Sequence, residues 1–125
     1  YLDKTGRPGS LQGLARHALI HCSSEGQAPV WRLSEDYPLR FEPRLAISTS
    51  AAALRAAIEG AGVVCCYQLE ARRACERGLL EPVAEPLWPA GHPLALTYPL
   101  GIRAPASVMA FLELATPWLR TQLVG

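Results

Sequence analysis

A pattern of helix and strand signals separated by glycine, over residues 48–80, constrains the fold more than any other part of the chain. Ser50 is a good N-cap residue, because its hydroxyl can accept a hydrogen bond from an unpaired amide of the first helical turn. Strong helix formers follow over residues 51–59. The apolar residues Leu54, Ala57, Ile58 and Ala61 recur at the spacing of one helical face. We therefore predict an amphipathic helix that ends at Gly60 and Gly62.

A short strand and a second helix follow these glycines. Residues 63–67 form a continuous apolar run, which is typical of a strand covered on both faces in a parallel sheet. Residues 69–77 then predict a helix closed by Gly78, and residues 80–83 predict another strand. The order helix, strand, helix, strand indicates an α/β fold.

The sequence before this pattern predicts further strands of the same kind. Ser10 can cap a short helix over residues 11–16, and residues 18–22 read as a buried strand. A strand is also expected over residues 30–34, closed by turn residues at 36–38. These elements extend the α/β order towards the start of the chain.

The remaining elements are a half-buried strand, a strand near the end and a closing helix. Apolar and polar residues largely alternate over residues 39–47, with Pro43 expected at an edge or at a break between two short strands. Residues 94–98 predict a strand, and Ser107 is expected to cap a last helix with a kink or stop near Pro117. Its apolar stripe would consist of Val108, Phe111, Leu112, Ala115 and Leu119.

Composition excludes several classes of protein. A chain of 125 residues, half of them apolar, suits one modest domain. No apolar stretch approaches the ~18 residues of a membrane span, so we expect a soluble chain with no membrane partner. The formal net charge is +1, and the densest basic group, Arg72, Arg73 and Arg77, is interleaved with glutamates as on a solvated helix face. Without a clustered basic face, this segment is not expected to bind DNA itself.

No catalytic, metal or cofactor site is expected. The four cysteines show no C-x-x-C spacing, and the adjacent Cys65 and Cys66 would point to opposite sides of a strand. We expect them to be small buried apolar residues; a thiol-dependent enzyme is the alternative, disfavoured because no motif positions a base beside them. The sequence also contains no H-E-x-x-H, G-x-S-x-G or P-loop motif.

Hydroxyl side chains follow the first predicted strand. Ser23 and Ser24 come directly after residues 18–22, and in open α/β sheets ligands bind outside the carboxyl ends of the strands. The alternative is an ordinary surface loop, in which serine is also common.

A second group of hydroxyls ends one predicted strand and begins the central helix. The group consists of Ser48, Thr49 and Ser50. A helix N-terminus favours an anion, and capping alone explains only one of the three hydroxyls. An uncharged, hydroxyl-rich lining suits a small carboxylate.

The pattern over residues 48–80 resembles the effector-binding domain of LysR-type transcriptional regulators, where it runs A-L-x-x-A-x-x-G-x-G-I and then L-x-x-G-x-L. The matching residues are Ala53-Leu54, Ala57, Gly60-Ala61-Gly62-Val63, Ala74 and Arg77-Gly78-Leu79-Leu80. The opening, with Tyr1-Leu2, Gly6, Pro8, Leu11, Leu14 and His17, is similar to the family's Y-L-x-x-x-G-x-P and D-L-x-x-H. Residues 93–99 and Ala110-Phe111 look like its last strand, Y-P and closing helix. The resemblance covers nearly the whole chain in the right order.

This resemblance implies a periplasmic-binding-protein-like (type 2) fold, with two Rossmann-like lobes and the first lobe incomplete. Residues 18–93 would form the second lobe, while residues 1–17 and 94–125 would be the remnant of the first. It also implies a cytoplasmic homo-oligomer that senses a small-molecule effector, an anion being favoured, in the cleft between the lobes. DNA would be contacted only through an N-terminal winged helix-turn-helix domain that is not in this chain.

The resemblance places the effector cleft at the Ser23 loop and at residues 48–50. Tyr67 and Gln68 stand where the family often has leucine-proline, so Tyr67 is open as a core residue or as an effector-binding residue. His17 fits the D-L-x-x-H position and is expected to be structural. A solute-binding protein of a transport system has the same architecture and is the alternative function. The sequence preceding Tyr1 would discriminate the two, because a regulator carries a basic helix-turn-helix there and a transporter a signal peptide.

Overall fold

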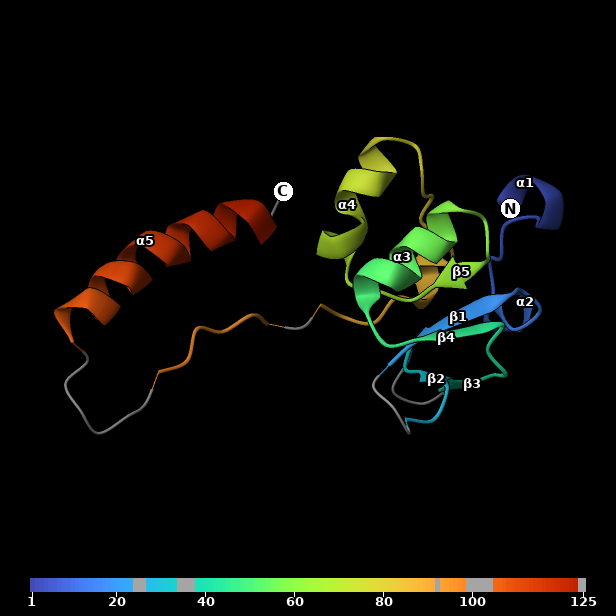
Figure 1. The fold of residues 1–125 in the computed structure, drawn as a ribbon, viewed down its shortest axis with the longest axis horizontal. Coiled ribbons are helices and arrows are strands. Elements are labelled where there is room, and N and C mark those ends of the chain that lie inside the picture. Colours follow the sequence, from blue (N-terminus) through green and yellow to red (C-terminus); the bar gives the residue numbers. More distant parts are fainter. Residues whose placement is uncertain (24–26, 34–37, 92, 99–104, 124–125) are drawn as a thin grey trace. The chain divides into compact units, whose positions relative to one another are not determined.

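The computed structural model describes residues 1–23, 27–33, 38–91, 93–98 and 105–123. The chain separates into two compact units, Tyr1–Ala90 and Gly91–Gly125, and each is described by itself (Figure 1). The predictions for Ser24 and for the turn at 36–38 lie wholly or partly outside the described residues.

A three-stranded parallel sheet forms the centre of the first unit. The strand β1 (Leu19–Cys22) lies between β4 (Leu45–Ile47) and β5 (Val63–Val64). The register places Cys22 opposite Ile47, so β1 and β4 end side by side. Because all three strands run parallel, their carboxyl ends meet at one edge of the sheet. The α/β fold with a parallel sheet, predicted from the sequence, is therefore confirmed.

The helix α3 (Ser50–Ile58) covers one face of this sheet. Its most buried residues, Ala53 and Ala57, pack against Ile20 of β1, which is fully buried. A second helix, α4 (Gln68–Glu76), contacts α3 (Figure 1). Small side chains at these positions let α3 approach the strands closely.

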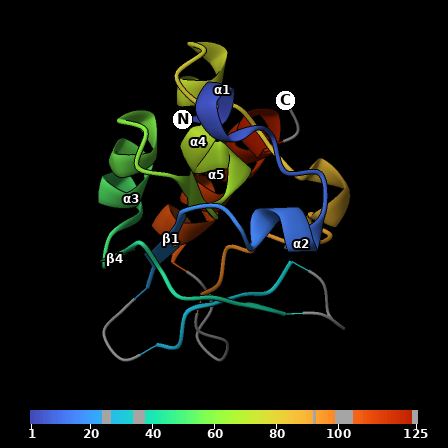
Figure 2. The same cartoon turned by 90° about the vertical axis from the view of Figure 1, so that its right-hand side faces the viewer.

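A helical turn and a hairpin pack under the opposite face. These are α2 (Leu11–Leu14) and the antiparallel strands β2 (Val30–Trp31) and β3 (Leu39–Arg40). The buried residues of this cluster are Leu14, Leu19, Trp31 and Leu39. Figure 2 shows α2 on the other side of β1 from α3. Successive side chains of β1 therefore enter two different clusters, as the alternation of a strand requires.

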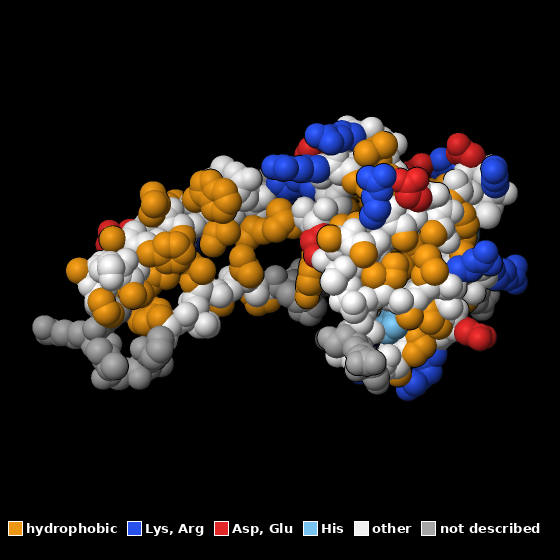
Figure 3. All heavy atoms as spheres, viewed as in Figure 1, with side chains coloured by type: hydrophobic (Ala, Val, Ile, Leu, Met, Phe, Trp, Pro, Cys, Tyr) orange, Lys and Arg blue, Asp and Glu red, His pale blue; other side chains and the backbone are white. Residues whose placement is uncertain are grey.

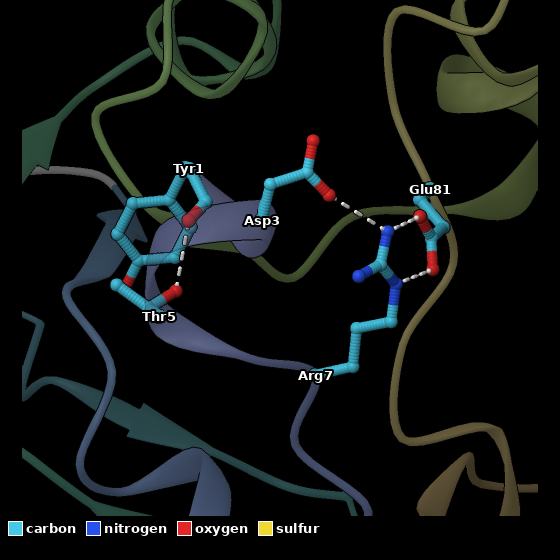
Figure 4. Close-up of polar contacts among 5 residues, drawn as sticks. All are labelled: Tyr1, Asp3, Thr5, Arg7 and Glu81. Carbon is cyan, nitrogen blue, oxygen red and sulfur yellow. Dashed lines mark hydrogen bonds and ion pairs between the residues drawn. The ribbon is translucent and has the colours of Figure 1, made fainter.

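Polar contacts fasten the start of the chain to the rest of the first unit. The Tyr1 hydroxyl accepts from the Ala18 amide at 2.8 Å and lies 3.1 Å from His17 Nδ1. After the short helix α1 (Leu2–Thr5), Arg7 makes a two-point contact with Glu81, with its Nη2 atom 2.7 Å from Oε2 (Figure 4). The contact to Tyr1 fits the structural role expected for His17.

The second unit consists of α5 (Ala106–Leu123) and the extended segment 93–98. The half-buried face of α5 consists of Val108, Leu112, Ala115, Thr116 and Leu119. Leu94, Leu96 and Tyr98 line a groove together with this face. The predicted apolar stripe is thus largely confirmed, except that Phe111 is 60% exposed.

Four predicted strands differ from the structure. The strand expected over residues 30–34 ends at Trp31, since residues 32 and 33 are not in a strand. Residues 80–83 and 94–98 are not strands, because no described strand lies beside them to complete the hydrogen bonding. The strand expected over residues 63–67 ends at Val64, where the chain turns towards α4. The alternating run over 39–47 is divided into β3 and β4, with Pro43 in the break as predicted.

The helix ends also differ in detail. The helix expected over residues 11–16 is a single turn, α2. The last helix begins at Ala106, so Ser107 lies inside its first turn, and it continues past Pro117. A proline removes one backbone donor, but the helix continues to Leu123. Beyond the proline, Thr121 Oγ1 donates to the Pro117 carbonyl at 3.0 Å. The helix stop predicted at Gly60 is confirmed by its left-handed φ of 82°.

The segment η1 (Glu85–Leu87) is a short 3-10 helix in the first unit. It follows Ala84, which adopts a left-handed conformation with φ of 55°. The indole N–H of Trp88 donates to the Val83 carbonyl at 3.0 Å and closes this turn.

Candidate functional site

The carboxyl ends of β1 and β4 bring two of the predicted site residues onto adjacent chain segments. Ser23 follows β1, and its amide donates to the carbonyl of Ile47, the last residue of β4, at 3.1 Å. This bond continues the parallel pairing beyond the end of β1. Ser48 follows Ile47 directly and is exposed, whereas Ser23 is half-buried. The predicted neighbourhood of the Ser23 loop and residues 48–50 is thus present.

Thr49, not Ser50, is the N-cap of α3. Its backbone is extended, and its side chain accepts from the Ala52 amide at 3.4 Å. Ser50 already has a helical position, so the capping role predicted for it was wrong. The first amides of an α-helix have no intrahelical partner, and those of α3 begin directly after Ser48 and Thr49. This places the positive end of the helix dipole at the same edge as Ser23.

Tyr67 lies beyond the carboxyl end of β5, the third strand of the sheet. It precedes α4 as its N-cap residue, and its amide donates to Glu70 Oε2 at 3.2 Å. The side chain is 71% exposed, so the core role left open by the sequence is wrong. Its role in effector binding stays a prediction.

The structure adds His21, a buried polar residue of β1 that lies within the strand predicted over residues 18–22. Its imidazole is buried, with Nε2 2.7 Å from Ser23 Oγ and 3.4 Å from the Gln27 carbonyl. The ring also packs edge-to-face on Phe41, at a centroid distance of 5.9 Å. Residues two apart on a strand share a face, and this spacing in the sequence could have indicated the contact between His21 and Ser23.

The adjacent Cys65 and Cys66 do not have the lowered pKa of a reactive thiol. Cys65 is exposed, so the expectation that it is buried was wrong, while Cys66 is half-buried. Burial raises the pKa of the Cys66 thiol to about 11, with smaller contributions from Cys65 and Glu70. A raised pKa keeps this thiol protonated and weakly nucleophilic at neutral pH.

Neither metal binding nor membrane insertion is indicated by the described part of the chain. It holds no group of three or more His, Cys, Asp or Glu residues arranged to bind a metal ion. Among the same residues, no helix has both the length and the apolar character needed to span a bilayer.

A parallel α/β sheet with hydroxyl side chains and a helix N-terminus at its carboxyl edge is the arrangement of a partial lobe in the periplasmic-binding-protein-like fold of type 2. The sequence model of the LysR substrate binding domain matches residues 1–120, so the chain belongs to this family. Searches of curated proteins and of solved structures gave no significant match.

Membership of this family favours a transcriptional regulator over a transport protein or an enzyme. LysR substrate binding domains sense effectors in LysR-type transcriptional regulators, which are not enzymes. A solute-binding protein of a transport system would have the same architecture, but the family match assigns the chain to the regulators. The resemblance stated from the sequence is therefore confirmed.

Proposed function

We propose that the chain senses a small anionic metabolite, which binds at the carboxyl edge formed by β1 and β4. The observation that carries this proposal is the hydrogen bond from the Ser23 amide to the Ile47 carbonyl at 3.1 Å. This bond keeps Ser23 beside residues 48–49, which lead into α3. The candidate lining consists of Ser23, Ser24, Ser48, Thr49, Ser50 and Tyr67, of which Ser24 lies outside the described residues.

The chemistry of this lining favours an anion. Hydroxyls can donate to carboxylate or phosphate oxygens, and the first amides of α3 point in the same direction as the positive end of its dipole. Neither Ser23 nor residues 48–50 contributes a charged side chain. A small carboxylate can therefore be held by neutral donors, as anions commonly are at helix N-termini.

The regulatory step follows from a difference in affinity. In this proposal residues 18–93 form the second lobe, and residues 1–17 with 94–125 belong to the first. An effector that binds one arrangement of the lobes more tightly shifts the population towards it. A cytoplasmic homo-oligomer would pass this shift to DNA through its N-terminal DNA-binding domain.

A thermal-shift screen tests the chemical class of the effector. The full chain is heated with small carboxylates, with inorganic phosphate and with uncharged amides of the same shapes. We expect carboxylates to raise the melting temperature, since a ligand that binds only the folded state stabilises it. The variant Ser23→Ala should lose this response, whereas Ser107→Ala, in the first turn of α5, should keep it. Equal responses to amides and carboxylates would contradict an anion site.

A further inference from the structure

His21 is a buried polar side chain whose two ring nitrogens have different surroundings. The residue is only 8% exposed. Its Nε2 atom lies 2.7 Å from Ser23 Oγ and 3.4 Å from the Gln27 carbonyl oxygen. Its Nδ1 atom is buried and has no hydrogen-bond partner among the described residues. Within the described part of the chain, the polar contacts of the ring are therefore made by Nε2.

These surroundings select one tautomer of the ring. A neutral imidazole carries a single N–H, on either Nδ1 or Nε2. A proton on Nδ1 would bury a donor without an acceptor, which proteins avoid more strictly than a buried lone pair. The Gln27 carbonyl can only accept, so it also favours a proton on Nε2. The Nε2 atom is then the donor in both contacts, and Ser23 Oγ takes part only as an acceptor, whatever the direction of its own hydrogen.

The two contacts of Nε2 tie two points of one segment to the end of β1. Ser23 comes directly after β1, and its side chain lies on the same face of the strand as that of His21, because the two residues are two positions apart. Gln27 follows four residues later. A single imidazole N–H therefore joins the end of the strand to a backbone carbonyl further along the chain.

The imidazole is itself held in place by aromatic packing. The ring of His21 meets Phe41 edge-to-face, at a centroid distance of 5.9 Å and an interplanar angle of 80°. Phe41 in turn packs on the buried Trp31 at 4.8 Å, and its amide donates to the Pro29 carbonyl at 3.3 Å. Turning Nε2 away from its two oxygens would disrupt this packing. The strands β2 and β3 thus support the ring from the side opposite to its polar contacts.

We propose that His21 is a positioning residue of the effector site, which holds Ser23 and Gln27 in place by donating from Nε2. This rests on the proposed function, in which Ser23 lines the site. The substitution His21→Leu removes the donor, but it also removes the unpaired Nδ1 atom from the interior. We therefore expect it to weaken effector binding without a matching loss of stability, whereas a purely structural residue would lose both together.

The tautomer can be measured without an effector. The full chain is labelled with nitrogen-15 histidine, and long-range proton–nitrogen correlations are recorded at neutral to slightly alkaline pH, with the His21 signals assigned through the backbone. Each tautomer gives a distinct pair of nitrogen shifts. We expect a protonated Nε2 and an unprotonated Nδ1. The opposite tautomer, or a doubly protonated ring, would overturn the inference.

A binding experiment tests the consequence for the site. Acetate is titrated into the wild-type chain, His21→Leu and His21→Gln, with acetamide as the uncharged control. Affinity is read from the Ser23 and Gln27 amide signals, and stability from chemical denaturation. Acetate should bind His21→Leu about three- to tenfold more weakly, as expected for the loss of one hydrogen bond. Glutamine can place an amide N–H near the position of Nε2 and should restore most of the affinity.

The matched control is His17→Leu, the same substitution just before the opposite end of β1, which should leave acetate binding unchanged. Unchanged acetate binding in His21→Leu, or an unfolded His21→Leu chain, would overturn the positioning role. So would a glutamine variant that binds acetate no better than the leucine variant. A wild-type chain whose Ser23 and Gln27 signals do not respond to acetate would instead count against the effector site, while the tautomer measurement would still decide the state of His21.

Discussion

Gly62 and Ala18 approach each other so closely that a Cβ atom on residue 62 would lie 2.1 Å from the Ala18 carbonyl oxygen. The contact occurs where β1 and β5 begin to pair, and the Val63 amide donates to the same oxygen at 2.8 Å. Gly62 also has a φ of 149°, which side chains disfavour. The second glycine of the G-x-G turn is therefore required by the packing of the sheet as well as by the end of α3.

Replacing this glycine should be severely destabilising. The variant Gly62→Ala must either move β5 away from β1 or distort the backbone, and we expect a loss of at least about 2 kcal/mol in unfolding free energy. Chemical denaturation followed by circular dichroism measures it. Gly9→Ala is the matched control, because a Cβ there meets no atom within 4 Å. Similar stabilities for the two variants would contradict the close approach.

The cap of α3 makes a second prediction. Thr49→Ala should lower the unfolding free energy by about 1 kcal/mol, because the Ala52 amide loses its acceptor. Ser50→Ala should cost much less, since Ser50 lies inside the first turn. Thr49→Ser should retain most of the stability. If Ser50→Ala were the more damaging change in the same denaturation assay, the helix would begin one residue later than described.

The ion pair of Arg7 and Glu81 predicts a dependence on pH. The Arg7 guanidinium holds the pKa of the Glu81 carboxyl below its usual range. A lowered folded-state pKa means that the stabilisation is present at neutral pH and is lost as the pH falls through that value. Both side chains are about half exposed, so the contribution should be small and should weaken with salt.

A double-mutant cycle with Arg7→Met and Glu81→Gln isolates this interaction. We expect a favourable coupling at neutral pH and low salt that disappears in acid. Asp3→Asn is the comparison, because its single contact to Arg7 is longer, at 3.3 Å, and its side chain is almost fully exposed. A coupling that persists unchanged in acid would show that the two residues interact through packing and not through charge.

The sequence predicts the parts of this structure that depend on local chemistry. Glycines and apolar periodicity marked α3, β5 and α4 because both signals act within a few residues. The choice between Thr49 and Ser50 as the cap depends on backbone angles that two adjacent hydroxyl residues do not distinguish. Residues 94–98 have a strand composition, but a strand needs a neighbour, and none of the described strands is adjacent.

In the candidate site, too, features set by local sequence were predictable, and features that depend on distant parts of the chain were not. Hydroxyls at strand ends are visible in the sequence, and the rule for α/β sheets locates them at one edge. The burial of His21 depends on packing against Phe41, a residue from a separate part of the chain. Such non-local packing is not encoded in a short motif.

The exposed side of α5 predicts self-association of the isolated chain. Phe111, Leu114 and Trp118 are 60%, 75% and 62% exposed and fall on one helical face. Figure 3 shows apolar side chains gathered along this helix. Burying each would contribute on the order of 1.5–3 kcal/mol, and monomers rarely expose large contiguous apolar patches.

Light scattering over a dilution series measures this association. The wild-type chain should form dimers or larger species at tens of micromolar, and the combined variant Leu114→Glu and Trp118→Glu should dissociate. Arg73→Glu, at an exposed position of α4 in the first unit, provides a charge-change control. A monomeric wild-type chain at these concentrations would contradict the prediction.

Mapping a carboxylate titration onto the amide spectrum tests the central claim most directly. The full chain is labelled with nitrogen-15 and titrated with the carboxylate that gives the largest thermal shift. If the effector binds at the carboxyl edge of β1 and β4, the largest changes will occur at Ser23, Ser48, Thr49 and Ala51, and they will vanish in Ser23→Ala. Changes concentrated in residues 93–98 and α5, with the Ser23 amide unmoved, would contradict the account.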